Sequence, residues 1–310
     1  MNKLIKQAFT LIELLVVIAI IGILSGLIVV SMSGVTQKAT IAKAQVFSNS
    51  LRNALMLDLV SEYKLDQINS PSSNQIVDSW GLNVGTLSDT SGVCSYVSPY
   101  KCPQLQTTNC ISSNCLSFDG SDDFVSLLNI SNLDVTNLNT YTLSAWIKTS
   151  ASATMAVIGY ASLSGNAPII QFGEVSSGLA LFQHRDDSSN IVTITSSSPA
   201  IYVNDGKWHY VVGVRSSTND YKLYVDGTLC GTGSTTVGTT TITEIALGVL
   251  KRAVPGSYFN GTADEIRIFK AAIPTSQIQE QYYIGLNNLL ISGSITKEEY
   301  LNRFKELAIK

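Results

Sequence analysis

The sequence is poor in charge and in histidine. Only 14% of its 310 residues are Asp, Glu, Lys or Arg, whereas an average soluble domain has about 25%, so the surface must rely on Ser, Thr, Asn and Gly for solubility. The net charge is −3, and the basic face of a nucleic-acid-binding protein is not expected. The two histidines, His184 and His209, are both predicted to be structural.

Motifs for common hydrolytic chemistry are also missing. The chain contains no G-x-S-x-G string and no phosphate-cradling glycine loop. A retaining glycosidase needs two carboxylates about 5–5.5 Å apart, which on one strand requires a string such as E-x-D-x-E. Asp264 and Glu265 are adjacent, so their side chains should point to opposite faces of a strand. We therefore predict that the protein is not an enzyme.

Five cysteines are present, and four of them lie close together in a stretch rich in Ser, Asn and Pro: Cys94, Cys102, Cys110 and Cys115. Their spacing lacks the paired C-x₂₋₄-C pattern of a zinc site, which only Cys110 and Cys115 approach. We predict disulfides and an oxidising compartment. Four cysteines allow three pairings, and the sequence does not choose among them. Cys230 is either a buried thiol or the partner of one of the four.

One long apolar run stands near the start of the chain. Residues 11–30 contain a single charge, Glu13, and as a helix they would be about 30 Å long, the thickness of a membrane's hydrocarbon core. Residues 1–64 carry a net charge of +3 and the remainder −6, so the basic end is also the apolar end. This predicts a single-pass membrane anchor with its N-terminus inside.

The residues before this run identify its type. A signal peptide has a small-residue cleavage site after its apolar segment, but here Ala8 stands before it. The string KQAFTLIE at residues 6–13 resembles the N-terminus of type IV prepilins. The resemblance implies that a prepilin peptidase cuts after Ala8, where the family usually has Gly, and that Phe9 is then N-methylated. Glu13 would meet the amine of a neighbouring pilin subunit during assembly.

The remainder reads as one helix followed by many short strands. We expect a leader over residues 1–8, a long helix over 9–58, and an antiparallel β-sandwich of the jelly-roll type. The fold class is thus α+β, mostly β. Strands are predicted at 59–65, 115–118, 124–127, 141–148, 156–160, 169–172, 179–184, 191–195, 208–215, 221–225, 228–230, 244–250 and 265–269.

Several strings resemble the laminin-G-like, concanavalin A-like jelly roll. They include DSWGLNVGTL at 78–87, LSFDGSDDF at 116–124, GKWHY at 206–210 and FNGTADEIRIF at 259–269. The resemblance covers a head at residues 59–283, with residues 91–114 as a cysteine-bearing insertion. It implies binding of a glycan or a surface protein, for which the possible contacts are Trp80, Tyr160, Phe182, Tyr202 and Tyr258. Aromatic residues of this kind are more often core than contact.

The same resemblance implies a candidate calcium site. The Asp78 turn, with Asn83, and Asp264 would approach each other and could bind Ca²⁺ through oxygen ligands. The alternative is that Asp78 forms an Asx turn and Asp264 caps a bulge.

A short helical tail is expected over residues 284–310. Thr296 and Glu299 form a capping box, and an apolar face follows it. The tail could mediate oligomerisation or pack back onto the head.

Together these features predict a prepilin-like subunit, of the minor pilin type, whose non-catalytic, lectin-like head serves filament assembly and adhesion. The alternative is a pseudopilin of a type II secretion or DNA-uptake apparatus. A surface glycan hydrolase is disfavoured by the missing carboxylate pair.

Overall fold

The computed structural model describes residues 58–66, 74–90, 92–94, 102–128, 130–164, 168–174 and 177–308. The predicted leader and long helix, with Ala8, Phe9 and Glu13, lie outside the described residues. Among the described residues, no helix is both long enough and apolar enough to cross a membrane.

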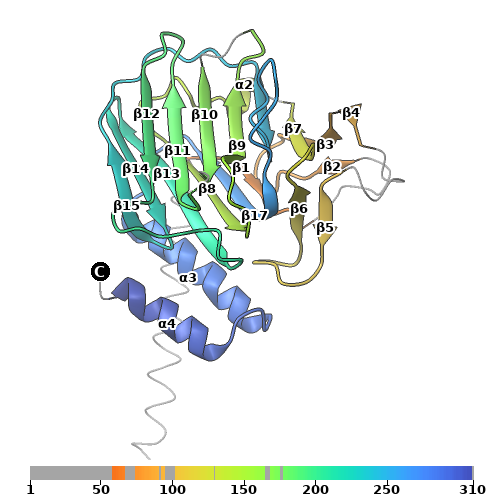
Figure 1. Cartoon of the computed structure of the whole chain (residues 1–310), viewed down its shortest axis with the longest axis vertical. Helices are drawn as coiled ribbons and strands as arrows, with labels where there is room; N and C mark the ends of the chain where they lie inside the picture. The colour runs from red at the N-terminus through yellow and green to blue at the C-terminus, as the bar shows by residue number, and fades with distance from the viewer. Residues whose placement is uncertain are drawn as a thin grey trace, which may run out of the picture. The chain divides into compact units, whose positions relative to one another are not determined.

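Two antiparallel sheets form the head (Figure 1). The first, sheet A, contains in spatial order β15 (Thr228–Gly233), β14 (Asp220–Val225), β13 (Trp208–Ser217), β8 (Tyr141–Lys148), β17 (Asn260–Phe269), β6 (Cys115–Asp119) and β5 (Gln104–Gln106), with β1 (Leu59–Tyr63) also paired to β17. The second, sheet B, contains β12 (Ile191–Thr195), β11 (Ala180–Arg185), β10 (Ile169–Glu174), β9 (Met155–Ala161), β16 (Glu244–Leu247), β7 (Phe124–Leu127), β3 (Gly85–Asp89) and β2 (Gln75–Ile76), with β4 (Gly92–Val93) paired to β3.

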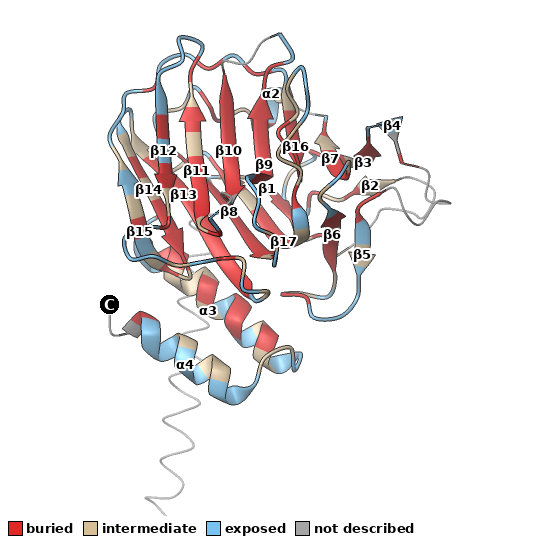
Figure 2. Cartoon of the chain, in the orientation of Figure 1, coloured by how far each residue is buried: buried red, intermediate tan, exposed pale blue. Residues whose placement is uncertain are grey.

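Alternating side chains build the core between the sheets. In β12, Val192 and Ile194 are buried in the main apolar cluster while Ile191 and Thr193 are exposed, as expected for a strand with one buried face. The central strands are red along most of their length in Figure 2, because loops or helices cover their outer faces as well. The predicted sandwich is confirmed.

A two-residue turn joins β14 to β15. Asp226 and Gly227 both have positive φ, at 52° and 75°, and they join β14 to β15 with Val225 paired to Thr228. A two-residue hairpin loop of this kind needs positive φ at both positions, which Asp-Gly provides at little cost.

Two helices cover the outer face of sheet A. They are α3 (Thr275–Ile291) and α4 (Lys297–Ala308), seen below the strands in Figure 1. Ile278, Tyr282 and Leu286 of α3 share an apolar cluster with Trp146 of β8 and Tyr210 of β13. The tail therefore packs back onto the head, one of the two outcomes that the sequence left open.

The helical pair begins earlier than the sequence suggested. α3 starts at Thr275 directly after Pro274, whereas the tail was expected from residue 284. Pro274 is the N-cap residue of α3 and has the extended backbone angles usual at that position. One of the two hydrogen bonds of the predicted capping box is present, since the Glu299 N–H donates to the Thr296 hydroxyl at 3.1 Å. The Glu299 carboxylate accepts from Arg303 at 2.9 Å. A short helix, α2 (Ile130–Leu133), was not predicted.

Candidate ligand-binding pocket

A pocket of about 780 Å³ lies on the outer face of sheet B. Its floor comes from β3 and β7, in which Leu87, Val125 and Leu127 point into the core and the alternating residues point outward. The loop between β16 and β17 forms one wall. The lining residues are Thr86, Ser88, Asp89, Thr90, Gly92, Phe124, Ser126, Leu128, Lys251, Pro255 and Tyr258.

The lining combines hydroxyl groups, aromatic rings and one cation. The Lys251 ammonium lies 2.9 Å from the Glu244 carboxylate and 5.4 Å from the centre of the Phe124 ring. It also donates to the Ser126 hydroxyl at 3.4 Å. A sugar presents hydroxyl groups at its edge and C–H groups on its faces, so it needs both hydrogen-bonding groups and aromatic surface. The pocket supplies both.

An acidic turn lies beside this pocket, between β6 and β7. One carboxylate oxygen from each of Asp119, Asp122 and Asp123 lies within 4.8 Å of the others. Burial raises the pKa of Asp123 to about 6. A hydrogen bond from the Asp119 N–H lowers this pKa, whereas the charges of Asp119, Asp122 and Asp89 raise it further. Asp89 also lines the pocket. The turn and the pocket therefore share one electrostatic environment.

The residues suggested for calcium form two separate networks. Asp78 and Asn83 do meet, at 3.1 Å, but the Asp78 carboxylate also accepts N–H groups from Glu62, Trp80 and Gly81 at 2.9–3.0 Å. These donors occupy the oxygen lone pairs that a cation needs. This is the Asx-turn arrangement that stood as the alternative.

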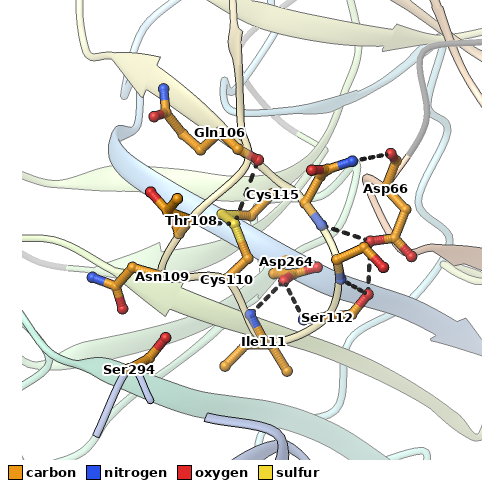
Figure 3. The surroundings of a disulfide bond; sticks show 12 residues. Asp66, Gln106, Thr108, Asn109, Cys110, Ile111, Ser112, Cys115, Asp264 and Ser294 are labelled. Carbon is orange, nitrogen blue, oxygen red and sulfur yellow. Dashed lines mark hydrogen bonds between the residues drawn. A yellow bond between two sulfur atoms is a disulfide. The ribbon is translucent and has the colours of Figure 1, made fainter. Parts of the chain in front are cut away.

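Asp264 binds a different part of the chain. It is fully buried, and its Oδ2 accepts the N–H groups of Ile111 at 2.8 Å and Ser112 at 3.1 Å, as Figure 3 shows. Within the part of the chain that the structure describes, Asp264 shares no hydrogen-bond partner with Asp78. Burial and the neighbouring Glu265 charge raise the pKa of Asp264 to about 8, against the opposing effect of these N–H groups. Its carboxylate thus holds the cysteine loop in place.

The four clustered cysteines form two disulfides. Cys94 pairs with Cys102 and Cys110 with Cys115, a pairing that the sequence could not choose. These bonds exclude a zinc site at the four cysteines, because a cysteine in a disulfide has no thiolate to bind metal. Cys230 is buried in the core, and its thiol donates to the Thr228 carbonyl at 3.1 Å, so it is a buried thiol.

The aromatic candidates divide between core and surface. Tyr160 and Phe182 are buried in the main core. Trp80 and Tyr202 are exposed at 40% and 57%, but neither lines the pocket. Tyr258 does line it.

Both histidines take part in buried networks. His184 lies 2.9 Å from the Tyr141 hydroxyl, and burial with the nearby Arg215 charge lowers its pKa to about 3. His209 lies 2.8 Å from Asp226 and 3.0 Å from Asp205. Burial disfavours its charged form, but the Asp226 charge and the hydrogen bonds of both aspartates outweigh burial and raise the pKa of His209 to about 9.

Part of the head matches a known protein superfamily. A family model described as the concanavalin A-like lectin/glucanases superfamily matches residues 119–279, which is just over half of the chain. The chain belongs to this superfamily. The match begins at the acidic turn and runs into α3, so it includes most of sheets A and B.

Solved structures agree on this fold. Domain 4 of the extracellular arabinanase AbnA from Geobacillus stearothermophilus, in complex with arabinotriose, is 17% identical with a TM-score of 0.52, covering 72% of this chain and 97% of that one. The binding domain of Paraclostridial Mosquitocidal Protein 1 is 14% identical with a TM-score of 0.54, covering 75% of this chain and 53% of that one. At such identities the likeness shows the concanavalin A-like fold alone.

The N-terminal segment has relatives of its own. Residues 5–29 match the prokaryotic N-terminal methylation motif. A stretch of 74 residues, 24% of this chain, is 40% identical to the type II secretion system core protein G of Escherichia coli strain K12. The chain spans about half the length of that curated relative, 48%. The chain therefore joins a prepilin-type N-terminus to a superfamily head.

Sequence reasoning missed the pocket itself. Nothing in the sequence brings Asp89 or Lys251 beside Asp122 and Asp123. A weak signal was present in the alternation of small hydroxyl residues with Leu87, Val125 and Leu127 on β3 and β7. Such alternation indicates a strand with a polar outer face, although it does not say what covers that face.

Proposed function

We propose that this chain is a membrane-anchored, pilin-type surface subunit whose head binds a glycan in the pocket on sheet B. The observation that carries the proposal is the lining of this pocket. It offers small hydroxyl side chains next to the aromatic rings of Phe124 and Tyr258. The hydroxyl residues are Thr86, Ser88, Thr90 and Ser126. The lectin-type fold and an arabinotriose complex of a structurally similar domain support the choice of a carbohydrate ligand.

The glycan proposal makes one prediction about the pocket. Replacing Tyr258 with alanine is expected to weaken binding about tenfold, equivalent to ~1.4 kcal/mol, because the variant loses an aromatic wall that faces the ligand. Binding would be measured with the full-length chain in detergent on an oligosaccharide array that includes arabinotriose. Tyr202→Ala is the matched control, since Tyr202 is 57% exposed and lies outside the pocket. A wild-type chain that binds no oligosaccharide would contradict a lectin role.

The anchor proposal makes a separate prediction. The native chain from its membrane fraction is expected to lack residues 1–8 and to begin with N-methylated Phe9, since residues 5–29 match the methylation motif. Intact mass and the mass of the N-terminal peptide test this directly. A chain that starts at Met1 would be a stationary membrane anchor, and the filament role would be abandoned.

A second candidate role is that of a pseudopilin, favoured by the similarity to the type II secretion system core protein G. In that role the head would contact partner pilins and no sugar. Processing at Phe9 together with an oligosaccharide array that stays negative would favour this role over adhesion.

A further inference from the structure

Among the described residues, the packing of α4 against the head leaves one face of this helix uncovered. The inner face is held by Arg303, whose guanidinium donates to the Trp208 carbonyl at 2.7 Å, and by Leu307, which is 8% exposed and packs in the apolar cluster beneath the helices. On the outer face, Leu301 and Phe304 are each 42% exposed, and much of α4 is pale blue in Figure 2. Side chains three residues apart are neighbours on a helix, so these two form a small apolar surface open to solvent.

Neighbouring aromatic rings hold Phe304 in position without covering it. The centre of its ring lies 4.9 Å from that of Tyr283 on α3 and 6.3 Å from that of Tyr300 on α4. Both tyrosines are half-buried. These contacts restrict the rotamers of Phe304, so little side-chain entropy is lost when a partner covers the exposed part of the ring. The apolar surface is therefore preformed for binding.

The charges beside this surface have opposite signs at its two ends. Glu298 and Lys305 are both exposed, and within the described part of the chain the ion pair of α4 joins Arg303 to Glu299 instead. Seven residues span about 10.5 Å along a helix, which is too far for Glu298 and Lys305 to pair with each other. Leu301 follows Glu298 by three residues and precedes Lys305 by four, so all three lie on one side of the helix. The face thus has a negative end, an apolar middle and a positive end.

We propose that this face of α4 binds the same face of a second copy of the chain, with the two helices antiparallel. When Leu301 lies opposite Phe304 of the second copy, Glu298 falls beside Lys305 of the second copy, and a two-fold axis repeats both contacts. The antiparallel arrangement also places the negative end of each helix dipole next to the positive end of the other. A partner of uniform charge would match only one end of the face, whereas a second copy matches both.

The contact is small, so we expect a weak and reversible dimer. A stable protein interface buries about 1,200–2,000 Å² in total, which is more than single faces of two 12-residue helices can supply. Smaller interfaces are typical of transient association. Because α3 and α4 cover sheet A and the ligand pocket lies on sheet B, the dimer would leave both pockets open. The proposal therefore does not depend on the ligand of the pocket.

Charge reversal tests this arrangement. Sedimentation velocity of the full-length chain in detergent, over a series of protein concentrations, measures the monomer–dimer equilibrium. Glu298→Lys and Lys305→Glu should each weaken dimerisation at least about tenfold, because each reversal turns both symmetry-related ion pairs into like-charge contacts. The matched control is Glu306→Lys, which makes the same charge change as Glu298→Lys at an exposed position of α4 on another side of the helix. Its dimerisation should equal that of the wild type.

An equimolar mixture of the two reversed variants separates this arrangement from association through another surface. The face of Glu298→Lys is positive at both ends and that of Lys305→Glu is negative at both ends, so the mixture should form dimers with wild-type affinity. The double variant should recover as well, although both of its charges oppose the helix dipole. Lost helix stability would therefore not reproduce the recovery. A wild type that stays monomeric, single reversals that dimerise like the wild type, or a mixture that does not recover would each overturn the proposal.

Discussion

Replacing Arg267 with methionine is expected to destabilise the head by about 3–5 kcal/mol, the usual cost of removing one partner from a buried ion pair. The Arg267 Nε lies 2.8 Å from the Glu62 carboxylate on the neighbouring strand β1. The same guanidinium binds Glu265, and the two glutamates are only 7% and 8% exposed. Without Arg267, two buried carboxylates would remain beside each other, and only the partly exposed Lys64, 3.8 Å from Glu62, would be left to compensate them.

Thermal unfolding of the purified chain measures this loss. Lys222→Met is the control, because Lys222 forms an ion pair with Asp220 at 2.8 Å whose side chains are 32% and 44% exposed. An exposed pair of this kind contributes no more than about 1 kcal/mol. If the two variants lost equal stability, the Arg267 cluster would have no special role. Adding Glu62→Gln and Glu265→Gln to Arg267→Met should recover part of the loss, since no buried charge then remains.

The second large effect is expected at Trp146. This residue is 1% exposed and lies between Tyr282 of α3, at 5.7 Å between ring centres, and Tyr210 of β13, at 5.3 Å. Trp146→Ala should cost about 3–5 kcal/mol, as large-to-small core changes do. Because α3 packs against the Trp146 ring, α3 and α4 should also become more accessible to protease in this variant.

Gly285 shows how closely α3 sits on that ring. A Cβ at this position would lie 2.3 Å from Trp146 Cζ2. Glycine-to-alanine changes in helices normally stabilise by about 1 kcal/mol, but Gly285→Ala should instead destabilise by about 1–3 kcal/mol through overpacking. Asn287→Ala, at an exposed position of the same helix, should be neutral or slightly stabilising. A stabilising Gly285→Ala would show that α3 does not pack on Trp146 as described.

Local sequence patterns predicted the regular part of this fold. Strands such as 124–127, 141–148 and 191–195 were expected at the bounds that β7, β8 and β12 have, because each alternates or carries a dense run of β-branched and aromatic residues. Short edge strands escaped prediction. β2 and β4 contain two residues each, too few to show a period, and they form only because β3 offers them a partner.

The candidate site was less predictable than the fold. Its parts come from β3, β7 and the loop before β17, which are far apart in the chain, and no local pattern encodes their meeting. The residues suggested as calcium ligands were equally hard to assign from the sequence. Asp78 and Asp264 both have the right chemistry, but whether backbone N–H groups or a cation satisfies them depends on tertiary contacts. Pairing of the cysteines depended on tertiary contacts in the same way.

The two disulfides also bear on aggregation of the protein at high local concentration, because they flank an edge strand of sheet A. β5 is the last strand of sheet A, and an edge strand can pair with the backbone of another molecule and start aggregation. β5 has only three residues, with one disulfide just before it at Cys102 and the other just after it at Cys110. The bond from Cys102 also reaches Cys94, which follows β4 of sheet B. The Cys94–Cys102 bond thus links the two sheets beside this edge, and the short β5 offers a neighbouring molecule little free backbone to pair with.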